Sequence, residues 1–514
     1  MRFHEEASRE HYDVVVVGGG LGGLSAAALL ARAGQNVLVV ERHDRPGGYA
    51  HAFRRRRYHF DSAVHLVGGC EPVPFGERGL IDRLLVALGV RNRCEFLRVD
   101  PCYAAHYDDF SLRAPLGIDE FVRAHVEAFP HQTKGLQDFV QTCLALRDES
   151  ARVSGANTAV TGQRVAERFP TLFRYRRATL ADVLEVTVPD RRLRAVLATL
   201  WPYLGLPPSR VSFLYFATML MSYIADGAFY CRGTFQRFAE ALASALKQAG
   251  GELLLRSPVR RIVAADGRAR GVVLENGQHI AAPVVISNAD ASQTLCELVG
   301  REHFPPRYLR KLKLRPSVSA FVVYTAVDAD LKRGDLEHET FVYPNFDHEA
   351  AYAGVLAGEP TWLSMTHPSA LDSSLAPPGQ QLVILTTLVA AKAQADWRAT
   401  KADFSARLLE LAERRLPGLH AQLRFSEAGT PRTLERYTRN EDGALYGWEL
   451  APDQIGPGRF GNATPVAGLY LAGHWAEPGG GVYGVLRSGI AAARLVLGLA
   501  SDEQLWSHLA REVT

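Results

Sequence analysis

The sequence has 514 residues and a formal net charge of +3, from 58 basic and 55 acidic side chains. This balance gives no indication of a nucleic-acid partner, and the length exceeds what one hydrophobic core usually organises, so we expect two domains. The 47% hydrophobic composition is that of an ordinary globular protein, and six scattered cysteines without a C-x-x-C pair favour free thiols over disulfides or a zinc site.

No stretch has the composition of a secretory signal or a membrane-spanning helix. The first ten residues are charged and lack an apolar run. The nearest approach to a span, residues 211–225, is shorter than the roughly 20 residues that a bilayer requires. We therefore expect a cytoplasmic protein. Four consecutive arginines, Arg54–Arg57, are typical of a solvated turn but could attract anionic headgroups, so peripheral membrane contact stays open, as does the oligomeric state.

The first motif in the chain combines a buried strand with a glycine-rich turn. Residues 14–17 are four consecutive valines, typical of a strand buried on both faces of a parallel sheet. Gly18, Gly20 and Gly23 follow in the G-x-G-x-x-G spacing: the first permits a tight turn, the second lets a pyrophosphate approach the backbone, and the third lets a helix pack on the strand. The expected helix, residues 21–33, would direct its free N–H groups at that phosphate.

A second expected strand, residues 37–40, leads into Glu41, which stands 18 residues after Gly23. A carboxylate at this place can accept hydrogen bonds from both hydroxyls of an adenosine ribose and disfavours a 2′-phosphate, so we expect FAD or NAD and not NADP. A glycine turn alone is weak evidence, but strand, turn, helix, strand and terminal acid occur here in order. Together they predict a Rossmann-like dinucleotide site.

The stretch after the second strand carries a family resemblance. Gly47 and Gly48 precede an expected hairpin, residues 50–60, and a Phe-x-x-x-x-Tyr-x-Phe-Asp run that ends at Asp61. With the preceding motif, these residues resemble the N-terminal FAD signature of the phytoene desaturase, carotenoid isomerase and retinol saturase family. Residues 60–65 are most similar to the retinol saturase and carotenoid isomerase branch.

Two long segments do not fit a nucleotide domain. Residues 76–225 show helical periodicity broken by prolines, and their stretch 193–216 also resembles the retinol saturase branch. Residues 301–424 alternate strand-like runs with a helix near 401–415, and we expect their strands to floor a substrate cavity that helices roof. A group of aromatic and methionine side chains suits either a packed core or a pocket for a long apolar ligand: Phe213, Tyr215, Phe216, Met219, Met221 and Tyr223.

The nucleotide domain is expected to resume at residue 228, with a helix and several short strands. The expected fold class is α/β, with a Rossmann-like FAD-binding domain of the glutathione-reductase-like flavoprotein and amine-oxidase superfamily and a discontinuous α+β substrate domain. The expected FAD-binding domain comprises residues 1–75, 228–300 and 425–514. The expected substrate-binding domain comprises residues 76–227 and 301–424.

The C-terminal stretch 468–484 resembles the second FAD motif of the family. Its glycines 479–481 open an expected helix whose positive end would stabilise an anionic reduced flavin. Many related flavoproteins carry an acid directly after the glycine that corresponds to Gly473, whereas this chain has His474. The resemblance implies FAD-binding roles for residues from several segments: Gly18, Gly20, Gly22, Gly23, Glu41, Arg42, Gly47, Gly48, Val259, Gly473, His474, Gly481 and Val482.

The resemblance also implies a function. It indicates an FAD-dependent oxidoreductase acting on carbon–carbon bonds of an apolar polyene or isoprenoid-like substrate, by desaturation, saturation or cis–trans isomerisation, with the motifs favouring the last two. Flavin chemistry needs neither a metal nor a protein nucleophile, and we expect no metal site. Three polar residues next to the motifs are candidate catalytic acids or bases: His65, Glu477 and Tyr446.

Other protein classes share this fold and stand as alternatives. One is an amine oxidase, flavin hydroxylase or halogenase; amine oxidases often carry a covalent cysteine link in a C-terminal turn, and no cysteine lies beyond Cys296. Another is a non-catalytic binder of prenylated proteins. Such binders depart from the glycine and acid pattern that Gly23 and Glu41 preserve.

Overall fold

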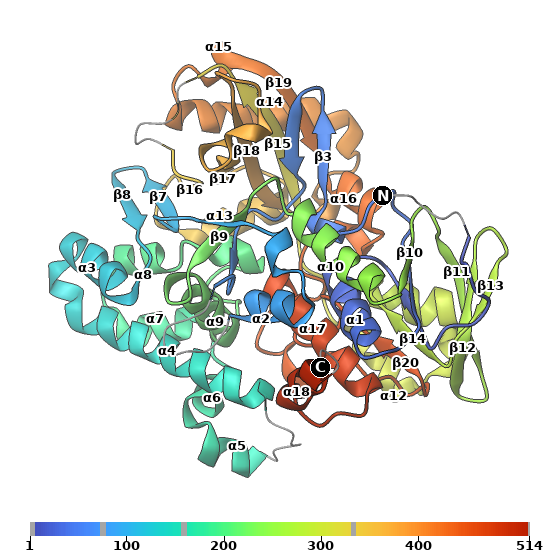
Figure 1. Ribbon diagram of the computed structural model, residues 1–514. Helices are drawn as coiled ribbons and strands as arrows, with labels where there is room; N and C mark the ends of the chain where they lie inside the picture. Colours follow the sequence, from blue (N-terminus) through green and yellow to red (C-terminus); the bar gives the residue numbers. More distant parts are fainter. Residues whose placement is uncertain (1–5, 72–78, 156–161, 330, 332–335, 512–514) are drawn as a thin grey trace.

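The computed structural model describes residues 6–71, 79–155, 162–329, 331 and 336–511 (Figure 1). A five-stranded parallel sheet gathers strands from both ends and the middle of the chain. Its strands, in spatial order, are β10 (Glu252–Leu254), β2 (Val37–Val40), β1 (Val14–Val17), β14 (Val284–Ser287) and β20 (Leu469–Leu471). The central strand β1 has parallel neighbours on both sides and cover on both faces, which suits its unbroken run of valines.

The two faces of this sheet are covered by different layers. Val14 and Val16 face a core that includes one helix layer, and Val15 and Val17 face a second core beneath a small antiparallel sheet. In Figure 1, α1 lies beside α10 and α17. The covering elements are α1 (Leu21–Arg32), α10 (Gln236–Gln248) and α17 (Gly481–Val496) on one face, and β11 (Val259–Ala265), β12 (Arg268–Leu274) and β13 (His279–Ala281) on the other. The expected Rossmann-like α/β fold is confirmed.

A seven-stranded mixed sheet forms the second layer system. Its strands, in spatial order, are β19 (Leu423–Gly429), β15 (Ser319–Val327), β18 (Gln381–Val389), β17 (Leu363–Thr366), β16 (Glu339–Val342), β7 (Tyr103–Tyr107) and β8 (Phe110–Ala114). On one face, side chains such as Phe321 and Leu385 pack against Phe404 and Leu408 of α14 (Trp397–Arg415). The opposite face is left for the cavity described below.

The segment expected to be helical contains strands as well. Between its first two helices, the segment forms β6 (Phe96–Arg98) and the β7–β8 hairpin, and the hairpin extends the seven-stranded sheet through a parallel pairing of β7 with β16. A periodicity averaged over 150 residues hides three such short strands. The helices of this segment are α2 (Leu80–Ala87), α3 (Ile118–Ala128), α4 (Thr133–Gly155), α5 (Gly162–Arg168), α6 (Pro170–Tyr175), α7 (Leu180–Thr187), α8 (Arg191–Leu197) and α9 (Phe213–Ile224).

Smaller elements complete the fold. The expected hairpin is present as β3 (Ala52–Arg55) and β4 (Tyr58–Asp61). The strand β19 crosses the expected domain boundary between residues 424 and 425, and the division into two domains stays a prediction. Among the described residues, no helix is both long and apolar enough to cross a membrane. Further elements are β5 (Val67–Gly68), β9 (Ala228–Cys231), α13 (His348–Ala357), α16 (Pro431–Thr438) and α18 (Asp502–Arg511).

Candidate active site

One cavity of about 500 Å³ runs from the C-terminal ends of β1 and β2 to the free face of the seven-stranded sheet. Gly23 and Glu477 are the two predicted site residues that do not line it. The other predicted residues all do: Gly18, Gly20, Gly22, Glu41, Arg42, Gly47, Gly48, His65, Val259, Tyr446, Gly473, His474, Gly481 and Val482. The fold therefore brings segments more than 400 residues apart to one cavity, as in the pair Gly18 and His474.

The glycine-rich turn between β1 and α1 leaves no room for side chains. Gly18 has a φ of +99°, a conformation that favours glycine. A Cβ on Gly20 would lie 2.8 Å from the side-chain nitrogen of Asn288, and a Cβ on Gly23 would overlap the carbonyl oxygen of Gly18. Gly23 thus allows α1 to pack on β1, while Gly18 and Gly20 leave the N-terminus of α1 open to the cavity.

Glu41 joins the glycine-rich turn to the end of β2. One carboxylate oxygen accepts a hydrogen bond from the backbone N–H of Gly19 at 2.6 Å, and the other accepts one from the N–H of His43 at 2.7 Å. The side chain is buried and also lines the cavity. Arg42 beside it donates to the carbonyl oxygen of Arg436 at 2.8 Å, which anchors α16 to this edge of the sheet.

Asn288 lies at the centre of the turn, although the sequence motifs did not single it out. Its backbone N–H donates to the carbonyl oxygen of Val17 at 2.8 Å, which places its side chain among the cavity glycines. A Cβ on Gly22 would lie 2.7 Å from the Asn288 amide oxygen, and a Cβ on Gly473 would lie 2.5 Å from the same atom. The sequence signal that could have indicated Asn288 is its position directly after β14, the strand next to β1. The C-terminal ends of neighbouring parallel strands lie at the same edge of a sheet, where such folds bind their ligands.

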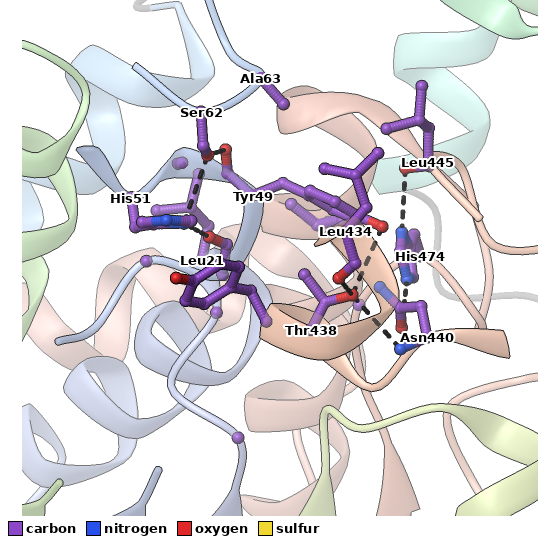
Figure 2. A pocket seen from close by; sticks show the side chains of 18 of the residues that line it. Leu21, Tyr49, His51, Ser62, Ala63, Leu434, Thr438, Asn440, Leu445 and His474 are labelled. Carbon is purple, nitrogen blue, oxygen red and sulfur yellow. Dashed lines mark hydrogen bonds between the residues drawn. The ribbon is translucent and has the colours of Figure 1, made fainter. Parts of the chain in front are cut away.

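The ring of His474 is fixed by two oxygen atoms (Figure 2). Its Nδ1 lies 3.3 Å from the carbonyl oxygen of Leu445, and its Nε2 lies 3.2 Å from the side-chain oxygen of Asn440. The same Asn440 oxygen accepts a hydrogen bond from Trp475 at 2.8 Å. Burial lowers the pKa of His474 to about 4, so the ring is neutral near pH 7. The position where the family resemblance led us to consider an acid is therefore uncharged here.

The N-terminus of α17 opens onto the same region. Gly481 and Val482 form its first turn and line the cavity, and a Cβ on Gly481 would meet no atom within 4 Å. The preceding Gly480 packs against Tyr446, because a Cβ there would lie 2.7 Å from the Tyr446 Cα atom. The free N–H groups of this turn make the local potential positive.

Two of the three predicted catalytic residues, Tyr446 and Glu477, are poorly placed to transfer a proton to a molecule in the cavity. The Tyr446 hydroxyl donates to the carbonyl oxygen of Pro202 at 2.9 Å, and burial raises its pKa. Glu477 lies outside the cavity lining; burial raises its pKa, and the charges of Lys311 and Arg459 oppose that shift. Glu477 therefore has no direct access to a molecule in the cavity.

His65 lies against the free face of the seven-stranded sheet. Its Nδ1 is 3.3 Å from the Thr366 hydroxyl, its Nε2 has no hydrogen-bond partner among the described residues, and burial lowers its pKa to about 3. The sheet itself forms the wall of the cavity, as expected. The wall consists of alternate residues from four adjacent strands: Ala320, Val322, Glu339, Phe341, Ser364, Thr386 and Leu388.

The aromatic residues of α9 belong to the core rather than to the cavity. Phe213, Phe216 and Met221 are fully buried, and the Tyr215 hydroxyl donates to the carbonyl oxygen of Pro478. None of the six aromatic and methionine residues noted in this helix is part of the cavity lining. Tyr203, Phe341 and Trp362 contribute the aromatic surface instead.

Comparison with known proteins identifies the relatives of the chain. A family model described as "flavin containing amine oxidoreductase" matches residues 21–497. Prolycopene isomerase 1 of an Oncidium hybrid cultivar is 28% identical, with 96% of this chain and 84% of that protein covered. All-trans-retinol 13,14-reductase of Danio rerio is 27% identical (90% and 82%), and the neurosporene-forming phytoene desaturase of Rhodobacter capsulatus is 29% identical (94% and 93%).

A similar fold occurs in solved structures. Cyclohexylamine oxidase from Brevibacterium oxydans superposes with a TM-score of 0.61 and 18% sequence identity, with 97% of this chain and all of that chain covered. At this level of identity the likeness concerns the fold alone.

Proposed function

This chain belongs to the flavin containing amine oxidoreductase family and is an FAD-dependent oxidoreductase, and we propose that it acts on carbon–carbon bonds of an apolar polyene or isoprenoid-like molecule. The observation that carries this proposal is that one continuous cavity contains both ends of the site. One end has the features of a dinucleotide site, and the other is a largely apolar sheet face. Both reactants can therefore meet without leaving the protein interior.

The residues at the first end fit FAD. The open N-terminus of α1 and its glycines suit a diphosphate, since a Cβ at Gly20 or Gly22 would close the cradle against Asn288. Glu41 offers a carboxylate at the end of β2, where a ribose binds in such folds. The N-terminus of α17 suits the electron-rich side of a reduced isoalloxazine ring. The assignment of each residue to a part of FAD stays a proposal.

The apolar end supports a hydrocarbon substrate. Bound FAD supplies or accepts a hydride, and the protein contributes orientation and exclusion of water. Phe341, Leu388 and Trp362 offer apolar surface, and the relatives named above include an isomerase, a reductase and a desaturase. The reactions in question are thus isomerisation, saturation and desaturation, and the sequence resemblance favours the first two.

Anaerobic incubation tests this proposal. The visible spectrum of purified protein is measured before and after dithionite, and each form is then mixed with a cis-polyene, a saturated isoprenoid or an aliphatic amine. We expect a polyene product from the reduced form. Flavin reoxidation by the polyene indicates saturation, and product without reoxidation indicates isomerisation. Bleaching of the oxidised form by the isoprenoid indicates desaturation.

Two results would overturn the proposal. Bleaching of the oxidised form by the amine alone would indicate an amine oxidase, the main alternative on this fold. Lack of flavin absorbance after reconstitution with FAD would indicate a non-catalytic binder.

We further propose that the tip of the β3–β4 hairpin contacts an anionic membrane surface while the substrate is exchanged. Arg54, Arg56 and Arg57 are exposed, whereas Arg55 pairs with Glu427 at 2.8 Å. Flotation with anionic liposomes should retain the protein at low salt and release it at high salt. Equal flotation of a variant with Arg56→Ser and Arg57→Ser would contradict this contact.

A further inference from the structure

We propose that Glu339 is a catalytic acid and base of this enzyme, which exchanges a proton with a substrate carbon in the cavity. The inference rests on the proposed function, because it needs a carbon–carbon bond that is saturated or desaturated as the reacting group. Glu339 was not among the residues that the sequence motifs indicated. It begins β16, a strand whose other residues are Thr340, Phe341 and Val342.

The position of Glu339 on the sheet directs it toward the substrate end of the cavity. Its strand neighbour two residues on, Phe341, lines the cavity from the same face. Across the antiparallel pair, Glu339 stands opposite Thr366 and Phe341 stands opposite Ser364, which also lines the cavity. Glu339 is 1% exposed, so the carboxyl group is inside the protein and next to the place where an apolar substrate would lie.

Four of the side chains that line this cavity carry an unpaired polar atom. Oε1 of Glu339, Nε2 of His65, Nε1 of Trp362 and Oγ1 of Thr386 are buried and have no hydrogen-bond partner among the described residues, and all four side chains line the cavity. Most buried polar groups in proteins are paired. Four unpaired ones around one apolar cavity indicate a place that a ligand completes.

The surroundings of Glu339 keep its carboxyl group neutral. The titratable groups against it are His338, whose Nε2 lies 3.9 Å from Oε1, and Tyr203, Tyr223 and Cys102. Burial raises the pKa of Glu339 to about 8, although the hydroxyls of Tyr203 and Thr366 partly oppose this. A carboxyl group with this pKa is protonated near pH 7 and can still release its proton, which suits a general acid.

The other candidates are less suited to give a proton. His65 has a pKa of about 3, so it does not carry an extra proton at neutral pH. The Tyr446 hydroxyl already donates to the Pro202 carbonyl oxygen. His65 instead holds the local geometry: its carbonyl oxygen lies 2.9 Å from Nε2 of His338, and its ring contacts Thr366.

The proton balances the reaction in either direction. In saturation the C=C π bond breaks, a hydride from the reduced cofactor forms one C–H bond, and the proton from the Glu339 O–H forms the other. The substrate gains two electrons, the cofactor loses two, and the carboxylate regains a proton from water. In desaturation the carboxylate accepts the proton of one C–H bond while the hydride of the neighbouring C–H bond leaves to the oxidised cofactor.

The variant Glu339→Gln in the FAD-loaded enzyme tests the proposal. We expect FAD content and the visible spectrum to stay as in the wild type, KM for the polyene to change little, and kcat to fall by roughly 10²–10⁴-fold. In the wild type, kcat/KM for saturation should fall above about pH 8, because the protonated form of Glu339 is lost there. For desaturation, kcat/KM should instead rise above about pH 8, because the carboxylate is the active form. The variant should lack this pH-dependent limb of the profile in either direction.

A control variant and a spectroscopic signal separate this role from a structural one. Asp61 is also a buried acid, with a pKa raised by burial to about 7, but it accepts hydrogen bonds from Tyr230 and Phe235 and does not line the cavity. The variant Asp61→Asn should keep the change of kcat/KM near pH 8 that the wild type shows. Infrared difference spectra of the wild type should show a protonated carboxyl band that disappears through about pH 8 and is absent in Glu339→Gln.

The outcomes distinguish this inference from the proposed function. An active wild type whose Glu339→Gln variant keeps its kcat or its pH dependence near pH 8 overturns the role of Glu339 alone. If Glu339→Gln does not fold, the infrared titration of Asp61→Asn decides, because Asp61 also carries a carboxyl proton near neutral pH in the wild type. Lack of a band that disappears through about pH 8 in this variant overturns the inference. A flavin-loaded wild type that converts no polyene overturns the proposed function, and the inference with it.

Discussion

Glu41 illustrates how one side chain can serve both the fold and the cofactor. Its two carboxylate oxygens accept hydrogen bonds from the backbone of Gly19 and His43, and the same carboxylate lines the cavity. The negative charge is thus held in place before any ligand arrives. Such preorganisation reduces the entropy cost of binding.

Glu41→Gln should weaken FAD binding at least tenfold. A glutamine side chain offers one acceptor oxygen where two backbone N–H groups need one each, and hydrogen bonds to charged groups contribute about 1.5–3 kcal/mol. Fluorescence titration of the apoprotein with FAD measures the loss. The control Glu435→Gln changes an acid in a surface ion pair with Arg432 and should leave the affinity unchanged; equal affinities for all three proteins would contradict the role of Glu41.

His474 should make the protein less stable in acid. Its pKa is about 4 in the folded protein and near 6.5 when unfolded, so the unfolded chain binds the proton first as the pH falls. This residue's contribution is complete above about pH 6.5 and is lost toward pH 4, by roughly 1.4 kcal/mol per pH unit. Urea unfolding at saturating FAD should show a shallower pH dependence for His474→Asn; parallel curves would show that His474 is not responsible.

At the scale of elements, the crossing of α1 and α17 links the two FAD motifs. A Cβ on Gly489 of α17 would overlap the carbonyl oxygen of Gly22 in α1, so the two helices meet at the backbone. Helix α17 also presents Gly481 and Val482 to the cavity. A change in this crossing therefore moves part of the site.

Gly489→Ala should lower the free energy of unfolding by about 1–3 kcal/mol, since an added methyl group in a tight contact forces the backbones apart. FAD affinity should fall as well, because the N-terminus of α17 shifts. Gly461→Ala is the matched control, as a Cβ there meets no atom within 4 Å. Thermal unfolding and FAD titration give the comparison, and identical values for the two variants would refute the crossing argument.

Local patterns predicted many elements closely. The strands at 14–17 and 37–40 have the expected bounds, and α1 ends one residue before the expected end. Their signals lie within about 30 consecutive residues. The β7–β8 hairpin was missed because its place is set by pairing with β16, more than 200 residues later.

At the scale of the molecule, the cavity lies between the two large sheets, so its occupant should stabilise the protein as a whole. Free FAD at about 100 times its dissociation constant should add roughly 2.7 kcal/mol to the free energy of unfolding. Calorimetry of the apoprotein and the loaded protein measures this as a rise in Tm. A Tm that does not depend on FAD concentration would contradict binding to the folded state.

The sequence by itself determined the nucleotide-binding motif, the cofactor class and the family, because glycine spacing, a valine run and a terminal acid act within one short segment. Only the tertiary structure decided which distant residues share the cavity. Asn288 reaches the glycine turn through the pairing of β14 with β1, and Glu339 reaches His65 through the pairing of β16 with β17. In the latter case Thr366, the β17 partner of Glu339, makes the contact with His65. Such arrangements depend on strand register and burial across hundreds of residues, which no local periodicity contains.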